Sequence, residues 1–329
     1  MKAKKNQTKT EPKDALFIIN PVSGQGDKKK RKDEILHIAK ELGWRGNVVE
    51  TTKTLSASDI AIEEMNKGIT HIVVCGGDGT IMEALQVIIN KDITLGIVPL
   101  GTGNLFAQNL TITGSRKDMI QRALFGTKHK VDVGRANDTI FAIIAGMGFD
   151  ADVMRQAKRS LKTKFGPLAY LVSGFNNLHR RAGKYKVTID GKKSVTYTAK
   201  GIMIANMGQL QGGIEAVPKA YPQNGVLRVG IIQASGYPAW LSLLGNALLG
   251  NINKSPHYTL LKGKKITVES LSGPKAYQCD GNHFPPTKKL SVEIFPQAAT
   301  VLIDKGSKPG TNNIFSPILN FQKIRVYNP

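Results

Sequence analysis

The first part of the chain alternates short apolar runs with longer segments in which apolar residues recur every three or four positions. Short apolar runs bounded by turn residues are typical of buried strands, and the three-and-four spacing is typical of helices. The pattern predicts strands at 15–20, 47–52, 71–75 and 93–100, and helices at 27–42, 56–67, after residue 80 and from 105 to 110. Strands that alternate with helices indicate a parallel sheet covered on both faces.

The pattern changes after about residue 132, where strand candidates follow one another directly. Many of them alternate apolar and polar residues, which is typical of antiparallel strands with one buried face. These candidates lie at 141–146, 185–190, 194–206, 225–232, 264–270, 276–281 and 289–295, with helices inserted near 150–182 and 237–250. We therefore expect an α/β domain with a parallel sheet at 14–132 and a mainly antiparallel β-sandwich domain at 133–309. The segment 310–325 is a candidate to return to the first domain.

The stretch GGDGT at 76–80 stands between a predicted strand and a predicted helix. An Asp-Gly pair in such a place is also typical of a β-hairpin, but the residues after Thr80 do not alternate. Thr80 and Glu83 have the spacing of a capping box, which predicts the helix start at Thr80. Free N–H groups at a helix start favour an anion, so we interpret the turn as a phosphate site. Tight backbone packing is the alternative explanation.

Three glycine-containing loops follow predicted strands: the first at 20–26, the second at 76–80 and the third at 101–104. Ligands of open α/β sheets bind outside the carboxyl ends of the strands, so we expect the three glycine loops to converge there. None of them matches the dinucleotide-binding or the P-loop pattern. This argues against a Rossmann dehydrogenase and against a P-loop NTPase.

The composition indicates a globular protein with an acidic partner. The chain has 329 residues, of which 41% are hydrophobic and 6% aromatic, and a formal charge of +22. Such a charge favours an anionic membrane or a phosphorylated ligand. Few aromatic residues interleave with the basic ones, so no nucleic acid is expected. The basic run 28–32 is explained equally well as a solvated helix face.

The remaining features predict a cytoplasmic protein that associates peripherally with membranes. Cys75 and Cys279 have neither metal-site nor disulfide spacing. Residues 1–14 lack the apolar core of a signal peptide, and no apolar stretch has the length of a membrane span.

Several motifs together resemble the diacylglycerol kinase catalytic-domain family, which includes bacterial diacylglycerol kinases and sphingosine kinases. GGDGT alone is shared with NAD kinases, but further motifs narrow the match to lipid kinases: NPVSG (20–24), VPLGTGN (98–104), VDVG (131–134), AGMGFDADV (145–153), GPLAY (166–170) and YQCDGN (277–282). The resemblance implies a nucleotide-binding first domain, a lipid-substrate β-sandwich domain and an active site in the cleft between them. It implies ATP and Mg²⁺ as cofactors.

The resemblance also assigns site residues. By motif position, the nucleotide-binding residues are Asn20, Gly24, Thr52, Gly76, Gly77, Gly79, Thr80, Gly101, Thr102 and Gly103. Asp280 falls on the family's general base, and Asp78 is the second carboxylate that we select as catalytic. No metal ligand is assigned. The alternatives are an Asx turn at Asp78 and a plain hairpin turn at Asp280.

Two departures from the family pattern bear on function. Asn282 stands where the family's Asp-Gly-Glu motif has its second acid, and Asn224 stands where an acid usually helps hold a structural Mg²⁺.

The main hypothesis is an ATP-dependent kinase of a lipid hydroxyl, with diacylglycerol or a related membrane lipid as substrate at an anionic membrane surface. The alternative is a weakly active or non-catalytic member that binds nucleotide and membrane. The lipid's identity and the oligomeric state, including a homodimer, are left open.

Overall fold

The computed structural model describes residues 13–148, 182–210, 213–307 and 309, which fall into two compact units. The first unit contains the chain up to Val131 together with Ala298–Ser307, and the second contains Asp132–Gln297. Two strands, β7 (Thr127–Ala136) and β18 (Lys289–Ile303), carry the chain from one unit to the other. The helix expected near 150–182 and the segment 310–325 lie outside the described residues, apart from residue 182.

The first unit is built on a parallel sheet with the strand order β4-β2-β5-β6. Its strands are β4 (Val48–Glu50), β2 (Leu16–Ile19), β5 (His71–Gly76) and β6 (Thr94–Pro99). The end of β18 extends this sheet, since Thr300 and Val301 pair in parallel with β6. A short parallel pair, β1 (Lys13–Asp14) and β3 (Trp44–Arg45), lies outside this sheet.

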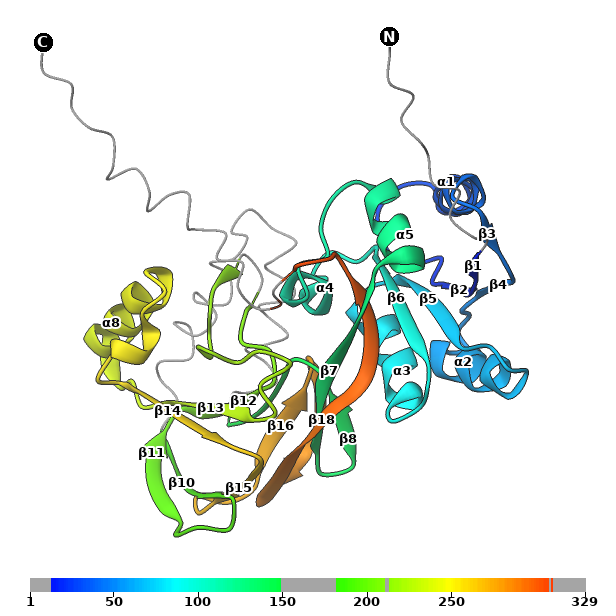
Figure 1. The fold of residues 1–329 in the computed structure, drawn as a ribbon. Helices are drawn as coiled ribbons and strands as arrows, with labels where there is room; N and C mark the ends of the chain where they lie inside the picture. The colour runs from blue at the N-terminus through cyan, green and yellow to red at the C-terminus, as the bar shows by residue number, and fades with distance from the viewer. Residues whose placement is uncertain (1–12, 149–181, 211–212, 308, 310–329) are drawn as a thin grey trace, which may run out of the picture. The chain divides into compact units, whose positions relative to one another are not determined.

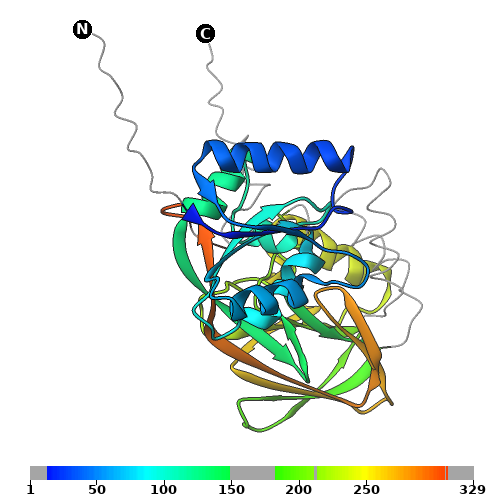
Figure 2. The ribbon, with the colours of Figure 1, turned by 90° about the vertical axis from the view of Figure 1, so that its right-hand side faces the viewer.

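Helices cover both faces of this sheet, as the continuous apolar strands predicted. On one face, α1 (Lys28–Glu41) and α5 (Arg116–Phe125) pack against Phe17 and Ile19 in one buried cluster. On the other face lie α2 (Ala57–Asn66) and α3 (Asp78–Ile88), below the sheet in Figure 2 where α1 is above it. The short helix α4 (Leu105–Asn109) follows β6. The predicted α/β architecture is confirmed.

The start of α3 differs from the predicted capping box, which is wrong. The helix begins at Asp78, its N-cap is Gly77, and no side chain caps it. Because the backbone turns helical earlier than predicted, Thr80 already lies inside the first turn. Its hydroxyl accepts a hydrogen bond from Asn20 Nδ2 at 2.8 Å. Glu83 instead accepts the N–H of Ala57, at the start of α2.

The second unit is a sandwich of two antiparallel sheets (Figure 1). The first sheet has the order β11 (Val195–Ala199), β10 (Gly183–Ile189), β15 (Lys265–Ser270) and β18. Strand β7 pairs with β18 on one side and with β8 (Thr139–Phe141) on the other. The other has the order β14 (Tyr258–Gly263), β13 (Leu227–Ile232), β12 (Gly201–Ala205), β9 (Ile144–Met147), β16 (Lys275–Cys279) and β17 (Asn282–Thr287). The predicted β-sandwich is confirmed.

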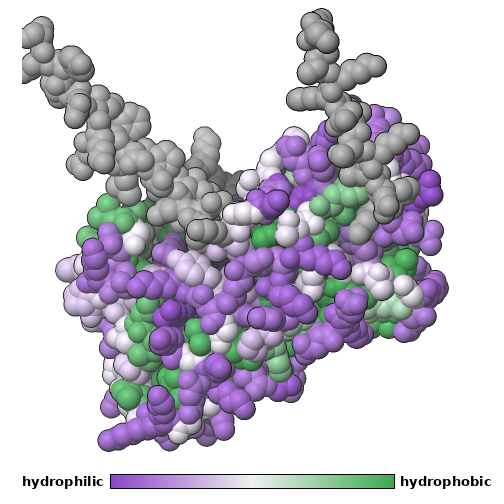
Figure 3. Space-filling model, in the orientation of Figure 1, coloured by the Kyte–Doolittle hydropathy of each residue, from purple (hydrophilic) through white to green (hydrophobic). Residues whose placement is uncertain are grey.

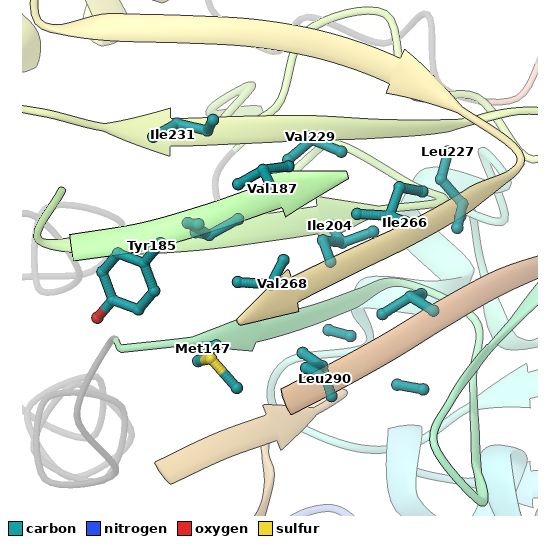
Figure 4. Close-up of a cluster of buried hydrophobic side chains, with 14 of the residues drawn as sticks. Met147, Tyr185, Val187, Ile204, Leu227, Val229, Ile231, Ile266, Val268 and Leu290 are labelled. Carbon is teal, nitrogen blue, oxygen red and sulfur yellow. The ribbon is translucent and has the colours of Figure 1, made fainter. Parts of the chain in front are cut away.

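The core of the second unit lies where the inner faces of the two sheets meet (Figure 4). Val187 and Val268 come from one sheet, while Ile204 and Val229 come from the other, and all four are almost completely buried. The outer surface of the second sheet carries α8 (Gly236–Leu248), followed by the 3-10 turn η3 (Ile252–Lys254). The run 194–206, predicted as one strand, is two strands, β11 and β12, that belong to different sheets.

Candidate functional site

The three glycine loops meet in the first unit, as predicted from the positions of the strands. The N–H of Gly77 in the second loop donates to Ser23 Oγ in the first loop at 3.3 Å. Asn20 of the first loop donates to Thr80 of the second. A Cβ built on Gly77 would lie 3.5 Å from the Cα of Gly101 in the third loop. Residues from three distant parts of the sequence therefore form one surface at the carboxyl end of the parallel sheet.

The first loop is shaped by one glycine and one buried arginine. Gly24 has a φ of +88°, and a Cβ there would lie 2.9 Å from the carbonyl oxygen of Leu100, so only glycine fits. Arg31, 7% exposed, donates from its guanidinium to the carbonyls of Pro21 and Gln25 at 3.1 and 2.7 Å. Part of the basic run 28–32 therefore supports the loop, whereas the lysines that precede Arg31 are exposed. The sequence alone gave no sign of this role.

The second loop presents an open helix N-terminus. In the described part of the chain, the N–H groups of Asp78 and Gly79 have no hydrogen-bond acceptor. A Cβ on Gly79 would meet nothing within 4 Å, so this turn faces open space. Unpaired N–H groups at the positive end of a helix dipole favour anions, which is the chemistry that a phosphate site requires.

The glycines of the second and third loops allow a close approach between the two backbones. A Cβ on Gly101 would lie 2.8 Å from the Cα of Gly77, too close for a real side chain. A Cβ on Gly103 would lie 3.2 Å from Asp78 Oδ2. At Gly77 itself the backbone is extended, with φ −89° and ψ −179°, so alanine would cause no backbone strain there. Thr102 is exposed between the two glycines.

Thr52 has a local role in the structure. Its hydroxyl accepts hydrogen bonds from the N–H groups of Thr54 and Leu55 at 3.2 and 3.0 Å. These bonds close the turn after β4, and neither of them reaches the glycine loops. Its assignment to the nucleotide site stays a prediction.

Asp78 links α3 to α4. Its Oδ2 accepts from the N–H of Leu105 and its Oδ1 from the N–H of Phe106, both at 3.0 Å. The N-cap of α4, Asn104, has a left-handed backbone and makes no side-chain cap, so Asp78 supplies the missing acceptor. Asp78 therefore caps the next helix instead of forming an Asx turn, and each of its oxygens keeps a lone pair.

Asp280 lies in the second unit, in the turn between β16 and β17. Its φ is +48°, so the sequence Asp-Gly does form the hairpin that was the alternative reading. The carboxylate nevertheless has a defined position. Oδ2 accepts from Ala142 N at 2.7 Å, and Oδ1 accepts from Ile143 N and Ile144 N at 3.0 and 2.9 Å. The side chain thus ties the hairpin to the start of β9.

Two family models match the chain in succession, the diacylglycerol kinase catalytic domain over residues 14–136 and the YegS C-terminal NAD kinase beta sandwich-like domain over 143–303. The chain belongs to the diacylglycerol kinase family. It is 27% identical to a Bacillus subtilis diacylglycerol kinase over 82% of this chain and 90% of that protein. It is 26% identical to a Staphylococcus aureus diacylglycerol kinase over 79% and 83%, respectively.

Solved structures of the family share the fold. A crystal structure of a diacylglycerol kinase from Bacillus anthracis superposes with a TM-score of 0.70 at 22% identity, covering 90% of this chain and 98% of that chain. The solved structure shows the shared fold, and the family models place the chain in a kinase family. In the described parts of the chain, no helix is long and apolar enough to cross a membrane.

The motif residue Asp132 has a supporting role that sequence reasoning missed. It is 1% exposed, and its carboxylate accepts from Gly225 N at 2.7 Å and from Gln297 N at 2.8 Å. These bonds fix the loop that carries Asn224, whose amide donates to Lys219 O. The signal was the VDVG motif, which marked the position but not its partners.

The donor set of this family member fits a nucleotide better than a resident metal ion. Within the described residues, no three His, Cys, Asp or Glu side chains gather as a metal site. Mg²⁺ needs only one or two carboxylates when phosphate oxygens and waters complete its shell. The residues present therefore suit an Mg²⁺ that arrives with ATP, with Asp78 as the candidate carboxylate of the first unit.

Burial makes both cysteine thiols poor nucleophiles. Burial raises the pKa of Cys279 to about 12, and the adjacent charge of Asp280 acts in the same direction. Burial also raises the pKa of Cys75 at the end of β5. Both thiols stay protonated near neutral pH, so neither supplies a thiolate nucleophile.

Proposed function

We propose that the protein is an ATP-dependent lipid kinase that transfers the γ-phosphoryl group to a hydroxyl of diacylglycerol or a related lipid at an anionic membrane surface. The observation that carries this proposal is the open N-terminus of α3 beneath the three converging glycine loops. Phosphoryl transfer depends mainly on positioning and on stabilising charge, with little covalent work for the protein. Backbone N–H groups at a rigid helix start provide both.

Each part of the chain has a role in this proposal. The N–H groups of Asp78 and Gly79 bind phosphate oxygens, and Gly24 and Gly101 let the neighbouring loops close around them. Mg²⁺, when bound with ATP, supplies the neutralisation of phosphate charge. Asp280 orients the lipid hydroxyl and accepts its proton as the general base.

The second candidate function is a non-catalytic or weakly active member. Asn282 and Asn224 favour it, because each removes a negative charge that would strengthen cation binding. Incubation with ATP, Mg²⁺ and diacylglycerol, followed by mass spectrometry of the lipid product, separates the two candidates. NAD serves as a parallel substrate. A phosphorylated lipid supports the kinase, whereas ATP binding without any product supports the alternative.

The phosphate role of the second loop predicts the effect of Gly77→Ala. The added methyl group makes only ordinary contacts in the fold but narrows the approach of the backbone to a phosphate. We expect ATP affinity measured by calorimetry to fall about tenfold, equivalent to about 1.4 kcal/mol, with little change in melting temperature. Gly245→Ala in α8 is the matched control, since a Cβ there also meets no obstacle. Wild-type ATP affinity in folded Gly77→Ala would refute the role.

The departure at residue 282 predicts a gain of function. Asn282 is exposed at the start of β17, so glutamate fits there without repacking. If this position helps to hold Mg²⁺, Asn282→Glu restores a carboxylate and raises kinase activity several-fold at limiting Mg²⁺, but little at saturating Mg²⁺. A titration of Mg²⁺ at fixed ATP measures this. An equal change at all Mg²⁺ concentrations would assign residue 282 a role unrelated to the cation.

A further inference from the structure

Helix α8 packs one apolar face against the described part of the second unit and exposes other apolar side chains on its opposite side. Ala239, Leu243 and Ala247 are buried against the second sheet, in a cluster with Ile232 and Tyr258. The opposite side is exposed: Tyr237 is 50% exposed, Leu241 59%, and Leu249, just after the helix, 58%. Hydrophobic side chains accordingly lie at the surface over α8 (Figure 3). An exposed apolar face of this kind marks a binding surface.

The charges around α8 favour one kind of partner. The helix itself contains no charged residue. No acidic residue occurs anywhere between Glu215 and Glu269, while this stretch contains the cations Lys219, Arg228, Lys254, Lys262, Lys264 and Lys265. Lys254 is exposed in η3, directly after the helix. An apolar helix face that carries no carboxylate of its own and is followed directly by an exposed lysine complements an anionic lipid surface.

The size of the surface argues against a second copy of the chain as the partner. A stable protein interface buries about 800 Å² on each side. The strongly exposed apolar residues are Tyr237 and Leu241 in the 13-residue helix and Leu249 directly after it, and these three side chains offer a smaller area than this. The helix is also too short to span a bilayer, which takes about 20 residues. An orientation in the plane of the membrane interface satisfies both limits.

We propose that the outer face of α8 docks on an anionic lipid bilayer, with Tyr237, Leu241 and Leu249 entering the boundary between headgroups and acyl chains. Lys254 then stays among the headgroups. This inference rests on the proposed function, because it names the surface through which a lipid kinase reaches its substrate. Vesicle binding can be measured without catalysis, so the two ideas fail independently.

The test uses flotation of the full chain with vesicles of phosphatidylcholine and phosphatidylglycerol that contain no diacylglycerol, in the absence of ATP. Leu241→Glu places a charge on the docking face and is expected to lower vesicle binding about tenfold. Leu271→Glu is the matched control, because Leu271 is also in the second unit and is 55% exposed. It is expected to bind like the wild type. Leu241→Ala, which keeps the helix, is expected to weaken binding by a smaller factor.

The outcomes separate the explanations. Equal vesicle binding by Leu241→Glu and the wild type overturns the proposal, as does an equal loss in both glutamate variants. Sedimentation that shows a dimer dissociated by Leu241→Glu, with unchanged vesicle binding, would assign the face to a second copy. Normal vesicle binding by a protein that phosphorylates no lipid would remove the proposed function and leave the docking face in place.

Discussion

Replacement of Asp280 by asparagine is expected to remove most phosphoryl transfer and to destabilise the second unit at the same time. Both carboxylate oxygens accept backbone N–H groups, so any orientation of the amide places an NH₂ group against at least one of these donors. The variant leaves a donor unsatisfied and loses charge-assisted hydrogen bonds, which lowers the free energy of unfolding by about 2–3 kcal/mol. Loss of a general base lowers the rate by about 10²-fold or more.

The two effects are separated by measuring kcat well below the melting temperature, where circular dichroism shows the variant to be folded. Asp190→Asn is the control, since Asp190 also has a left-handed backbone in a turn of the second unit and accepts the N–H groups of Lys264 and Lys265. Its Oδ1 accepts both bonds, so an amide oxygen can keep them. We expect wild-type activity from the control. Full activity in folded Asp280→Asn would leave this residue a purely structural role in the hairpin.

The parts of the site that the sequence predicted are those fixed by periodicity and strand direction. The apolar runs at 71–75 and 93–100 identify neighbouring parallel strands, whose carboxyl ends must lie together. The glycine loops that follow them therefore converge whatever the details of packing. The contact of Gly77 with Gly101 is a direct consequence of this order.

Other parts depend on contacts that local pattern does not encode. Arg31 looks like one cation in a basic run, and only the fold shows that its guanidinium binds carbonyls of the first loop. Thr80 and Glu83 have capping-box spacing, but each bonds to a residue far away in the sequence. In the run 194–206, Lys200 separates β11 from β12, which belong to different sheets. Periodicity cannot reveal a change of sheet.

Replacement of Asp78 by asparagine is the corresponding prediction for the first unit. Asp78 holds the N–H groups of Leu105 and Phe106, and α4 continues directly from the third glycine loop. An amide keeps one of these bonds and leaves the other donor facing an NH₂ group. This lowers the free energy of unfolding by about 1–2 kcal/mol. Since the third loop then loses its anchor beside the proposed phosphate site, we expect kinase activity to fall about 10²-fold.

The role of the Asp78 charge is distinguished from its capping role by a Mg²⁺ titration at saturating ATP, combined with thermal melting. If Asp78 helps to hold the cation, Asp78→Asn requires more Mg²⁺ for half-maximal activity, and excess Mg²⁺ restores part of the rate. Asp118→Asn is the matched control, because Asp118 accepts the N–H of Ser115 in the capping box of α5. It should lose a little stability and no activity. A lower melting temperature with an unchanged Mg²⁺ requirement would make Asp78 the cap of α4 and nothing more.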